Sequence, residues 1–187
     1  MIVGAVLTGG AGRRMGRTKP LVDVGGTSMA RRVISALEGA GCVAVAAIGG
    51  DPDELSALDV TVVPDDDPGE GPLGGIATAL RVFGSYTDAD VLVVACDLPF
   101  LGPDDLDRLV VAATTHLDAD AVVARTNRRE PGCVLWRPSS HLAVRSAFDH
   151  GERAVHRVLD VLHVVEVDLP ASSLRNINAP SDLPGYP

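Results

Sequence analysis

The chain has 187 residues, of which 46% are hydrophobic but only 3% aromatic, and its 25 acidic and 16 basic side chains give a formal net charge of -9. A chain of this length fits one domain whose core is built mainly from Val, Leu, Ala and Ile, which favours buried parallel strands covered by helices. The negative net charge repels long polyanions, so we expect no nucleic-acid partner.

The cysteines and the first residues indicate a cellular compartment. Cys42, Cys96 and Cys133 lie far apart and form no Cys-x-x-Cys pair, which suits a reduced cytosol and excludes a structural zinc site of that kind. The segment Met1–Leu7 lacks the basic leader and cleavage site of a signal peptide, and the chain turns glycine-rich too soon after it to span a bilayer. We therefore expect a cytoplasmic protein with no membrane partner.

Short apolar runs alternate with helical segments along the whole chain. The runs predict strands of a mostly parallel sheet, and they are Ile2–Leu7, Val43–Ile48, Val60–Val63, Val91–Ala95, Ala121–Ala124, Cys133–Trp136 and Val164–Val167. No internal repeat or low-complexity linker interrupts this alternation, so we expect an α/β protein of one domain.

Two helices are marked by residues typical of helix ends. Ser28 can cap a helix that runs to about Ala40 and is followed by Gly41. A second helix is predicted over Leu101–Thr115, with Pro103 near its first turn. Because open parallel sheets bind ligands beyond the carboxyl ends of their strands, the residues that follow the strands are the first candidates for a site.

The loop after the first run, residues 7–20, reads LTGGAGRRMGRTKP. Its glycines let the backbone approach a phosphate and turn N–H groups toward it, and Arg13, Arg14 and Lys19 add positive charge. The loop fits neither a dinucleotide fingerprint nor a P-loop, which needs Gly-Lys-Ser/Thr where the chain has Thr18-Lys19-Pro20. Pro20 disfavours a helical Lys19, so an extended segment is predicted there. The alternative is a surface turn with solvated basic residues.

Asp97 follows directly after the buried run Val91–Ala95. A carboxylate in that place can hold a divalent cation against bound phosphates, because magnesium prefers one or two carboxylates plus substrate oxygens and water. The alternative is that Asp97 caps the following turn. Cys96, beside it, is expected to pack as a small apolar residue.

Segment 64–76 combines an acidic cluster with a tight glycine-rich turn. One acidic oxygen can accept hydrogen bonds from both guanine N1–H and the 2-amino group, a donor pair that cytosine lacks. A solvated acidic loop is the alternative for Asp66 and Asp67. Near the C-terminus, the alternation of Asn176-Ile177-Asn178 points both asparagines to the same side. The alternative is that these residues only form turns.

These segments together resemble the nucleotidyltransferases of the molybdenum cofactor guanylyltransferase type. The resemblance rests on the glycine and basic loop 7–20, on Cys96-Asp97-Leu98-Pro99, on Gly71-Pro72-Leu73-Gly74-Gly75 and on the segment 176–183. It implies a single-domain three-layer αβα nucleotidyltransferase (Rossmann-like) fold with a mostly parallel mixed sheet, spanning residues 1–187. The chain departs from the family pattern at Thr18, where an Asp is frequent, and at Glu130, in the place of a His-Pro-containing acceptor stretch.

The resemblance also implies the roles of individual residues. Catalytic roles fall on Arg14, Lys19 and Asp97, the magnesium ligand is Asp97, and Asn176 and Asn178 contact the acceptor. Nucleotide binding is implied for Leu7, Thr8, Gly9, Gly10, Gly12, Lys19, Asp65, Gly71, Pro72, Leu73 and Asp97.

The reaction implied is transfer of GMP from Mg-GTP to the phosphate of molybdopterin, with release of pyrophosphate. That phosphate is already ionised near neutral pH, so alignment and charge neutralisation replace a general base. A molybdenum-insertion protein or a molybdoenzyme chaperone is the implied protein partner. The alternatives are a related nucleotidyltransferase that uses CTP or a sugar phosphate, and a nucleotide-binding regulator without transfer activity.

Overall fold

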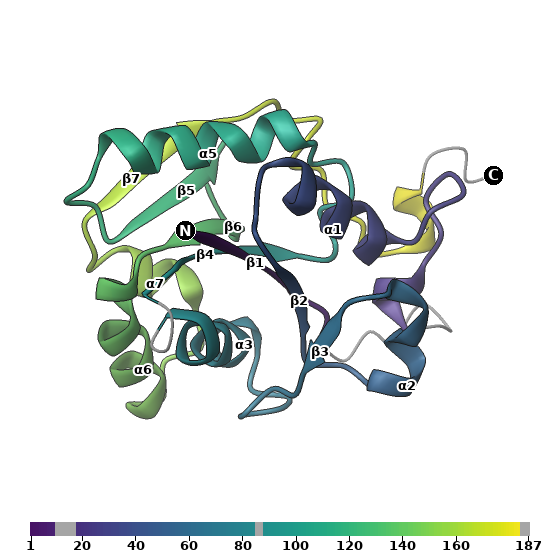
Figure 1. Cartoon of the computed structure of the whole chain (residues 1–187), viewed down its shortest axis with the longest axis horizontal. Coiled ribbons are helices and arrows are strands. Elements are labelled where there is room, and N and C mark those ends of the chain that lie inside the picture. Colours follow the sequence, from purple (N-terminus) through teal and green to yellow (C-terminus); the bar gives the residue numbers. More distant parts are fainter. Residues whose placement is uncertain (10–17, 85–87, 184–187) are drawn as a thin grey trace.

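The computed structural model describes residues 1–9, 18–84 and 88–183. A seven-stranded sheet lies between two layers of helices (Figure 1). The strands are β1 (Ile2–Leu7), β2 (Val45–Ile48), β3 (Thr61–Val63), β4 (Asp90–Ala95), β5 (Ala121–Arg125), β6 (Arg129–Trp136) and β7 (Val164–Asp168). The helices are α1 (Met29–Gly39), α2 (Pro52–Leu55), α3 (Pro72–Ala79), α5 (Pro103–Thr115), α6 (His141–Asp149) and α7 (Val155–Leu159). Every predicted apolar run contains a strand, although β2 starts two residues and β3 one residue later than predicted, and the αβα prediction is confirmed.

The strand order is β3-β2-β1-β4-β6-β5-β7. Neighbouring strands are parallel except at β6, which runs antiparallel to both β4 and β5. The mostly parallel mixed sheet is therefore confirmed. Strand β6 begins four residues before the predicted Cys133, because Arg129 pairs with Arg125 across a tight connection whose polar residues carry no apolar pattern.

Alternate residues of the central strands face two separate cores. Val6, Leu92 and Val94 pack with α1 and α5 on one face, whereas Leu7 and Val93 pack with α3, α6 and α7 on the other. Figure 1 shows these two helix layers above and below the sheet. Burial on both faces explains why the strands are continuous apolar runs instead of alternating ones.

The predicted ends of α1 and α5 are close to the observed ones. The Ser28 hydroxyl accepts a hydrogen bond from Arg31 N at 3.4 Å, and Gly41 follows the helix with a φ of +83°. Helix α5 starts at Pro103, and the Asp105 carboxylate accepts from Gly102 N at 3.0 Å. Both helices are thus fixed by local end contacts that the sequence carries.

The glycine-rich turn predicted within segment 64–76 ends at Gly71. Gly71 has a φ of +87°, but Pro72 begins α3, and Gly74 and Gly75 lie inside that helix. A Cβ on Gly74 would be 3.3 Å from Phe148, and one on Gly75 would be 3.2 Å from Leu7. These glycines let α3 pack closely against the sheet and α6.

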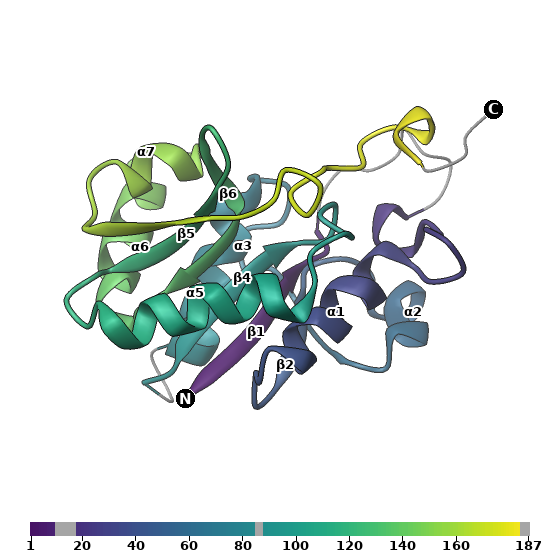
Figure 2. The ribbon, with the colours of Figure 1, turned by 90° about the horizontal axis from the view of Figure 1, so that it is seen from above.

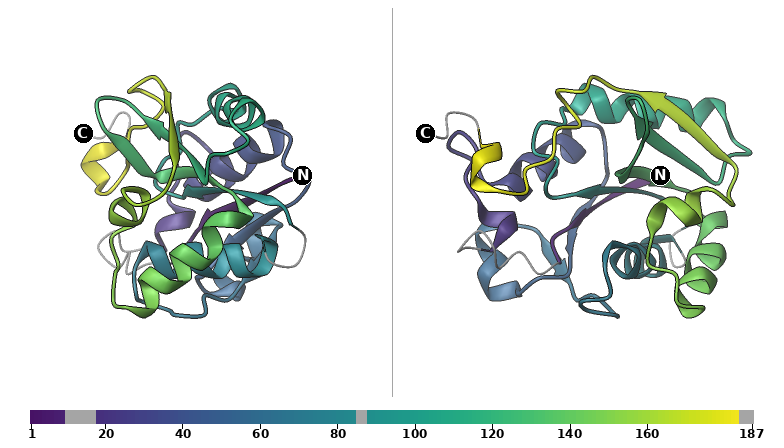
Figure 3. Two further views of the ribbon diagram at one scale, coloured as in Figure 1. Left: turned by 90° about the vertical axis from the view of Figure 1, so that its left-hand side faces the viewer. Right: turned by 180° about the vertical axis from the view of Figure 1, so that it is seen from behind.

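The last described segment returns from β7 toward the start of α1. Figures 2 and 3 show it passing the carboxyl ends of the central strands and reaching the residues that precede α1. Ile177 is fully buried there in a small cluster with Val22, Val24 and Met29. The C-terminal segment and the residues that precede α1 therefore lie together at the carboxyl edge of the sheet. Among the residues that the structure describes, no helix combines the length and hydropathy needed to cross a bilayer.

Leu92 offers a test of the core on the α1 and α5 face. It is fully buried in β4, between Gly4 of β1 and Leu135 of β6. We expect Leu92→Ala to lower the free energy of unfolding by about 2–5 kcal/mol, because it removes buried methyl groups and leaves a cavity. Urea denaturation measures the change. Val111→Ala, at a residue 53% exposed on α5, is the control and should change stability by about 0.5 kcal/mol or less; equal effects would contradict this core.

Candidate functional site

A pocket of about 710 Å³ lies at the carboxyl ends of β1, β2 and β4. This central pocket is lined by Leu7, Thr8, Gly9, Lys19, Pro20, Ile48, Gly49, Gly50, Asp65, Pro68, Gly69, Gly71, Pro72, Gly75, Ala95, Cys96, Asp97 and Asn178. The strand order reverses beside β1, with β2 on one side and β4 on the other, and such a switch point opens a crevice for ligands. The sheet thus gathers segments from both halves of the chain around one cavity.

Thr8 and Gly9 hold the end of β1 against the end of β2. The Thr8 hydroxyl is 2.7 Å from Gly49 O and 3.1 Å from Ile48 O, and it is almost fully buried. Gly9 N also donates to Ile48 O, at 3.1 Å. The Gly9 amide is therefore engaged within the protein and is not one of the loop N–H groups available to a phosphate. Gly9 nevertheless lines the pocket. The predicted phosphate contacts of Gly10, Gly12 and Arg14 lie outside the described residues.

The Lys19 side chain forms hydrogen bonds to two other predicted site residues, Asp97 and Asn178. Its Nζ donates to Asp97 Oδ2 at 2.9 Å and to Asn178 Oδ1 at 2.8 Å. The side chains of Lys19 and Asp97 are 21% and 25% exposed, so a ligand in the pocket can reach both. The sequence placed a cation and a carboxylate at one triphosphate; the structure brings them into the same pocket and pairs them directly.

The backbone at Lys19 differs from the extended segment predicted from Pro20. Lys19 begins a short 3₁₀ helix, Lys19–Leu21, closed by Leu21 N donating to Thr18 O at 2.9 Å. Pro20 fits because the first residues of a helical turn have no partner for their N–H groups, so its missing N–H costs nothing. The extended residue beside this turn is Val22, which follows it.

Asp182 fixes Asn178, a role that the sequence reasoning missed. Its Oδ2 accepts from Asn178 N and Ala179 N, both at 2.8 Å, and these two bonds lower the pKa of the Asp182 carboxyl. Ile177 N donates to Asp97 O at 2.9 Å, which ties the same segment to the end of β4. The signal was present as an acid four residues after an asparagine, a spacing typical of local side-chain capping.

Cys96 lines the pocket, and its side chain is buried. Burial first, and the neighbouring Asp97 carboxylate second, raise the pKa of its thiol to about 12. The thiol therefore stays protonated near neutral pH. The expectation that it packs as a small apolar residue agrees with its burial.

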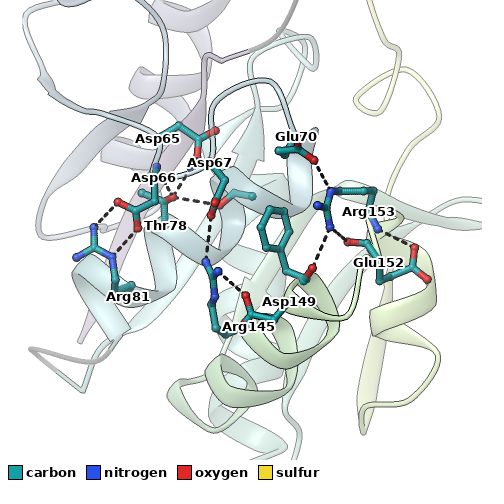
Figure 4. A network of polar contacts seen from close by, with 12 residues as sticks. Asp65, Asp66, Asp67, Glu70, Thr78, Arg81, Arg145, Asp149, Glu152 and Arg153 are labelled. Atoms are coloured by element: carbon teal, nitrogen blue, oxygen red, sulfur yellow. Dashed lines mark hydrogen bonds and ion pairs between the residues drawn. The ribbon is translucent and has the colours of Figure 1, made fainter.

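The carboxylates of the acidic cluster 65–67 all have hydrogen-bond or ion-pair partners, although Asp66 is also exposed to solvent. Asp65 lines the pocket, and its Oδ1 accepts from Asp67 N and Thr78 Oγ1, both at 3.1 Å. Asp66 forms a two-bond ion pair with Arg81, and Asp67 pairs with Arg145 at 3.0 Å (Figure 4). Of the three carboxylates, only Asp65 is among the pocket-lining residues.

Leu73 does not fit its predicted place in the nucleotide site. Gly71 and Pro72 line the pocket, but the Leu73 side chain has no exposed surface and packs in the core on the α3 face of the sheet. The physical reason is that Pro72 starts α3, so the next residue turns its side chain inward. Leu73 thus holds α3 in place and offers no side-chain atom to a nucleotide.

Asn176 and Asn178 line different cavities, although both lie in the same irregular segment. Asn178 is in the central pocket, whereas Asn176 borders a second hollow of about 570 Å³. That second hollow is lined by Arg128, Arg129, Glu130, Pro131, His156, Asp160 and Asn176. Only Ile177 separates the two asparagines, and its amide is bonded to Asp97 O, so the hollow adjoins the end of β4.

The basic residues near the second hollow divide into two kinds. Arg125 pairs with Glu166 and Asp168, and Arg129 pairs with Glu166 and Asp160. These contacts lower the pKa of Glu166, through Arg125 first and Arg129 second. Within the described residues Arg128 forms no ion pair, and its side chain is exposed in the hollow. Arg128 is thus the arginine of the three that stays free for an anionic ligand.

The oxygens of Asp97 and Asn178 fit a hard divalent cation. They already converge on one positive charge, Lys19 Nζ. Across residues 1–9, 18–84 and 88–183, no group of three or more His, Cys, Asp and Glu side chains is placed to enclose a metal. One carboxylate and one amide oxygen suit magnesium, which binds through few protein ligands and completes its shell with phosphate oxygens and water.

Fold and site together define a nucleotide-binding αβα protein with a lysine, a carboxylate and an amide gathered at the ends of the central strands. A family profile described as the MobA-like NTP transferase domain matches residues 4–167. The chain therefore belongs to the MobA-like NTP transferase family, and it is an NTP transferase by that membership.

Its relatives agree with this placement. The chain is 34% identical over 186 residues to the molybdenum cofactor guanylyltransferase of Rhodobacter capsulatus, covering 97% of this chain and 93% of that protein. It is also 34% identical to the molybdenum cofactor guanylyltransferase of Mesorhizobium japonicum, with 97% and 92% covered. The solved structure of molybdopterin-guanine dinucleotide biosynthesis protein A from Archaeoglobus fulgidus is similar with a TM-score of 0.76 and 27% identity, covering 97% and 94% of the two chains.

Proposed function

We propose that this protein transfers GMP from GTP to the phosphate of molybdopterin, giving molybdopterin guanine dinucleotide and pyrophosphate, and that one nucleotidyltransferase domain spans residues 1–187. The observation that carries the proposal is the meeting of Lys19, Asp97 and Asn178 in the central pocket, which also contains Asp65. The names of the relatives supply the substrates. The cytoplasmic location and a cofactor-delivering protein partner stay predictions from the sequence.

The proposed reaction needs little general acid or general base catalysis. An oxygen of the acceptor phosphate forms a bond to the α-phosphorus of GTP while the bond to the β-phosphate oxygen breaks, and pyrophosphate leaves with that electron pair. Lys19 holds phosphate oxygens by charge-assisted hydrogen bonds and offsets their negative charge as it moves toward the leaving group. Asp97 and Asn178 are the residues that would hold magnesium, which when bound neutralises charge on the phosphates.

The acceptor is proposed to approach from the side of the second hollow. Asn176 lies in that hollow and Asn178 in the central pocket, so the segment between them bridges the two cavities. Arg128 offers an exposed positive charge to a phosphorylated pterin. Molybdopterin in this position directs its phosphate toward Lys19 and Asp97.

The experiment is incubation of the protein with molybdopterin, magnesium and GTP, CTP, ATP or UTP in turn, with the dinucleotide identified by mass spectrometry. We expect the guanine dinucleotide and one equivalent of pyrophosphate. Asp97→Asn should lower the rate by about a hundredfold or more, because it removes the charge of the carboxylate that would hold magnesium against the phosphates. Asp107→Asn, at an exposed residue of α5, is the control for the same change of charge. A cytidine product would favour the CTP-using alternative, and an unchanged rate in Asp97→Asn would overturn the metal assignment.

The Lys19–Asp97 pair predicts how metal and nucleotide binding are coupled. Because Lys19 Nζ occupies the position between Asp97 and Asn178, the nucleotide-free protein should bind Mn²⁺ weakly. Lys19→Met should bind Mn²⁺ roughly tenfold more tightly without nucleotide, within the usual range of coupling between two sites. Electron paramagnetic resonance of free Mn²⁺ measures this. Lys19→Arg keeps the charge and should not gain affinity, and equal affinities in the Met variant and the unmodified protein would refute competition.

A further inference from the structure

The two oxygens of the Asp65 carboxylate have different surroundings. Oδ1 accepts from Asp67 N and from Thr78 Oγ1, each at 3.1 Å. A carboxylate oxygen has about two lone-pair sites, so these bonds fill Oδ1. In the part of the chain that the structure describes, no hydrogen bond reaches Oδ2, which lies near Gly75 in the wall of the central pocket. The acid therefore has one oxygen left for a ligand.

Thr78 is the buried side chain that bonds to Asp65 Oδ1. Its side chain is 1% exposed on α3, and its hydroxyl also accepts from Asp66 N at 3.1 Å. The hydroxyl proton has two acceptors within reach, Asp65 Oδ1 and Gly74 O, both at 3.1 Å. The charged oxygen is the stronger acceptor, so the proton goes to Asp65. Thr78 thus connects the Asp65 carboxylate and the Asp66 backbone N–H to α3.

Ion pairs hold the outer side of the same loop. Arg81 binds Asp66, Arg145 binds Asp67 and Arg153 binds Glu70, at 2.6 to 3.0 Å (Figure 4). Their side chains are 29% to 53% exposed, so water and salt weaken each pair. The Thr78 contact is shielded from water, and it acts directly on the carboxylate that lines the pocket. The orientation of Asp65 therefore depends more on Thr78 than on the arginines.

We propose that Thr78 is a positioning residue for base selection: it holds Asp65 Oδ1 so that Oδ2 faces the edge of a purine that carries both N1–H and a 2-amino group. The proposal rests on the proposed function, in which Asp65 reads the base. Without the hydroxyl, Oδ1 loses a donor and the carboxylate turns to find another. Recognition of the 2-amino group then weakens, while the phosphate contacts, which use other residues, stay.

The test compares GTP with inosine triphosphate, which lacks only the 2-amino group, by calorimetry in the presence of magnesium. The ratio of the two affinities within one protein cancels any uniform loss of binding-competent molecules. Thr78→Val has nearly the same shape but no hydroxyl, and Thr78→Ser keeps the hydroxyl. We expect Thr78→Val to reduce the preference for GTP by about tenfold, the size of a lost hydrogen bond to a charged group, and Thr78→Ser to retain it within about twofold.

Asp65→Asn separates failure of this proposal from failure of the base assignment. If Asp65→Asn leaves the preference for GTP unchanged, Asp65 does not read the base and the assignment on which the proposal rests is wrong. If Asp65→Asn removes the preference but Thr78→Val keeps it, the positioning role is refuted while the base assignment stands. If Thr78→Ser loses the preference as fully as Thr78→Val, the hydroxyl is not sufficient to orient the carboxylate and the proposal is also refuted. Thermal unfolding monitors the fold, and Thr78→Ala replaces the Val variant if that variant does not fold.

Discussion

The bonds from Lys19 Nζ to Asp97 and Asn178 connect three segments that lie far apart in the sequence. Lys19 is 78 residues from Asp97 and 159 residues from Asn178. Each segment is placed by a different part of the fold: β4 carries Asp97 at its carboxyl end, a 3₁₀ helix carries Lys19, and the returning C-terminal segment carries Asn178. A cation between two oxygens is also what a metal–phosphate site requires, so this contact links the fold to the proposed chemistry.

Residues that precede α1 and residues of the C-terminal segment hold this contact in place. Ile177 is buried with Val22, Val24 and Met29 and donates its amide to Asp97 O, while the Asp182 carboxylate holds the amide of Asn178. Apolar burial supplies the stability of this corner, and the hydrogen bonds supply its geometry. On the other side of the pocket, the close packing of α3 at Gly74 and Gly75 places Asp65 and Thr78 together. The pocket is thus framed by packing on both faces of the sheet.

Much of the fold follows from local sequence, and the site follows from it only in part. Strands such as β1 and β4 are apolar over their length because both faces are covered, and α1 carries its own cap at Ser28, so these elements were predictable. Asp97 and Lys19 were predictable as strand-end and loop residues. Thr78 was not, because a threonine inside an apolar helix gives no local sign of the acid that it contacts. The separation of Asn176 from Asn178 was also hidden, since it depends on how an irregular segment packs.

The most direct test of the account is a crystal structure of the protein with magnesium and α,β-methylene-GTP, an analogue that does not transfer its nucleotide. The account predicts one nucleotide in the central pocket, with Asp65 at the guanine edge, Lys19 on the phosphates, and Asp97 bound to a magnesium ion on the same triphosphate. A nucleotide bound elsewhere, or a triphosphate that contacts Lys19 while Asp97 holds no metal beside it, would contradict the account.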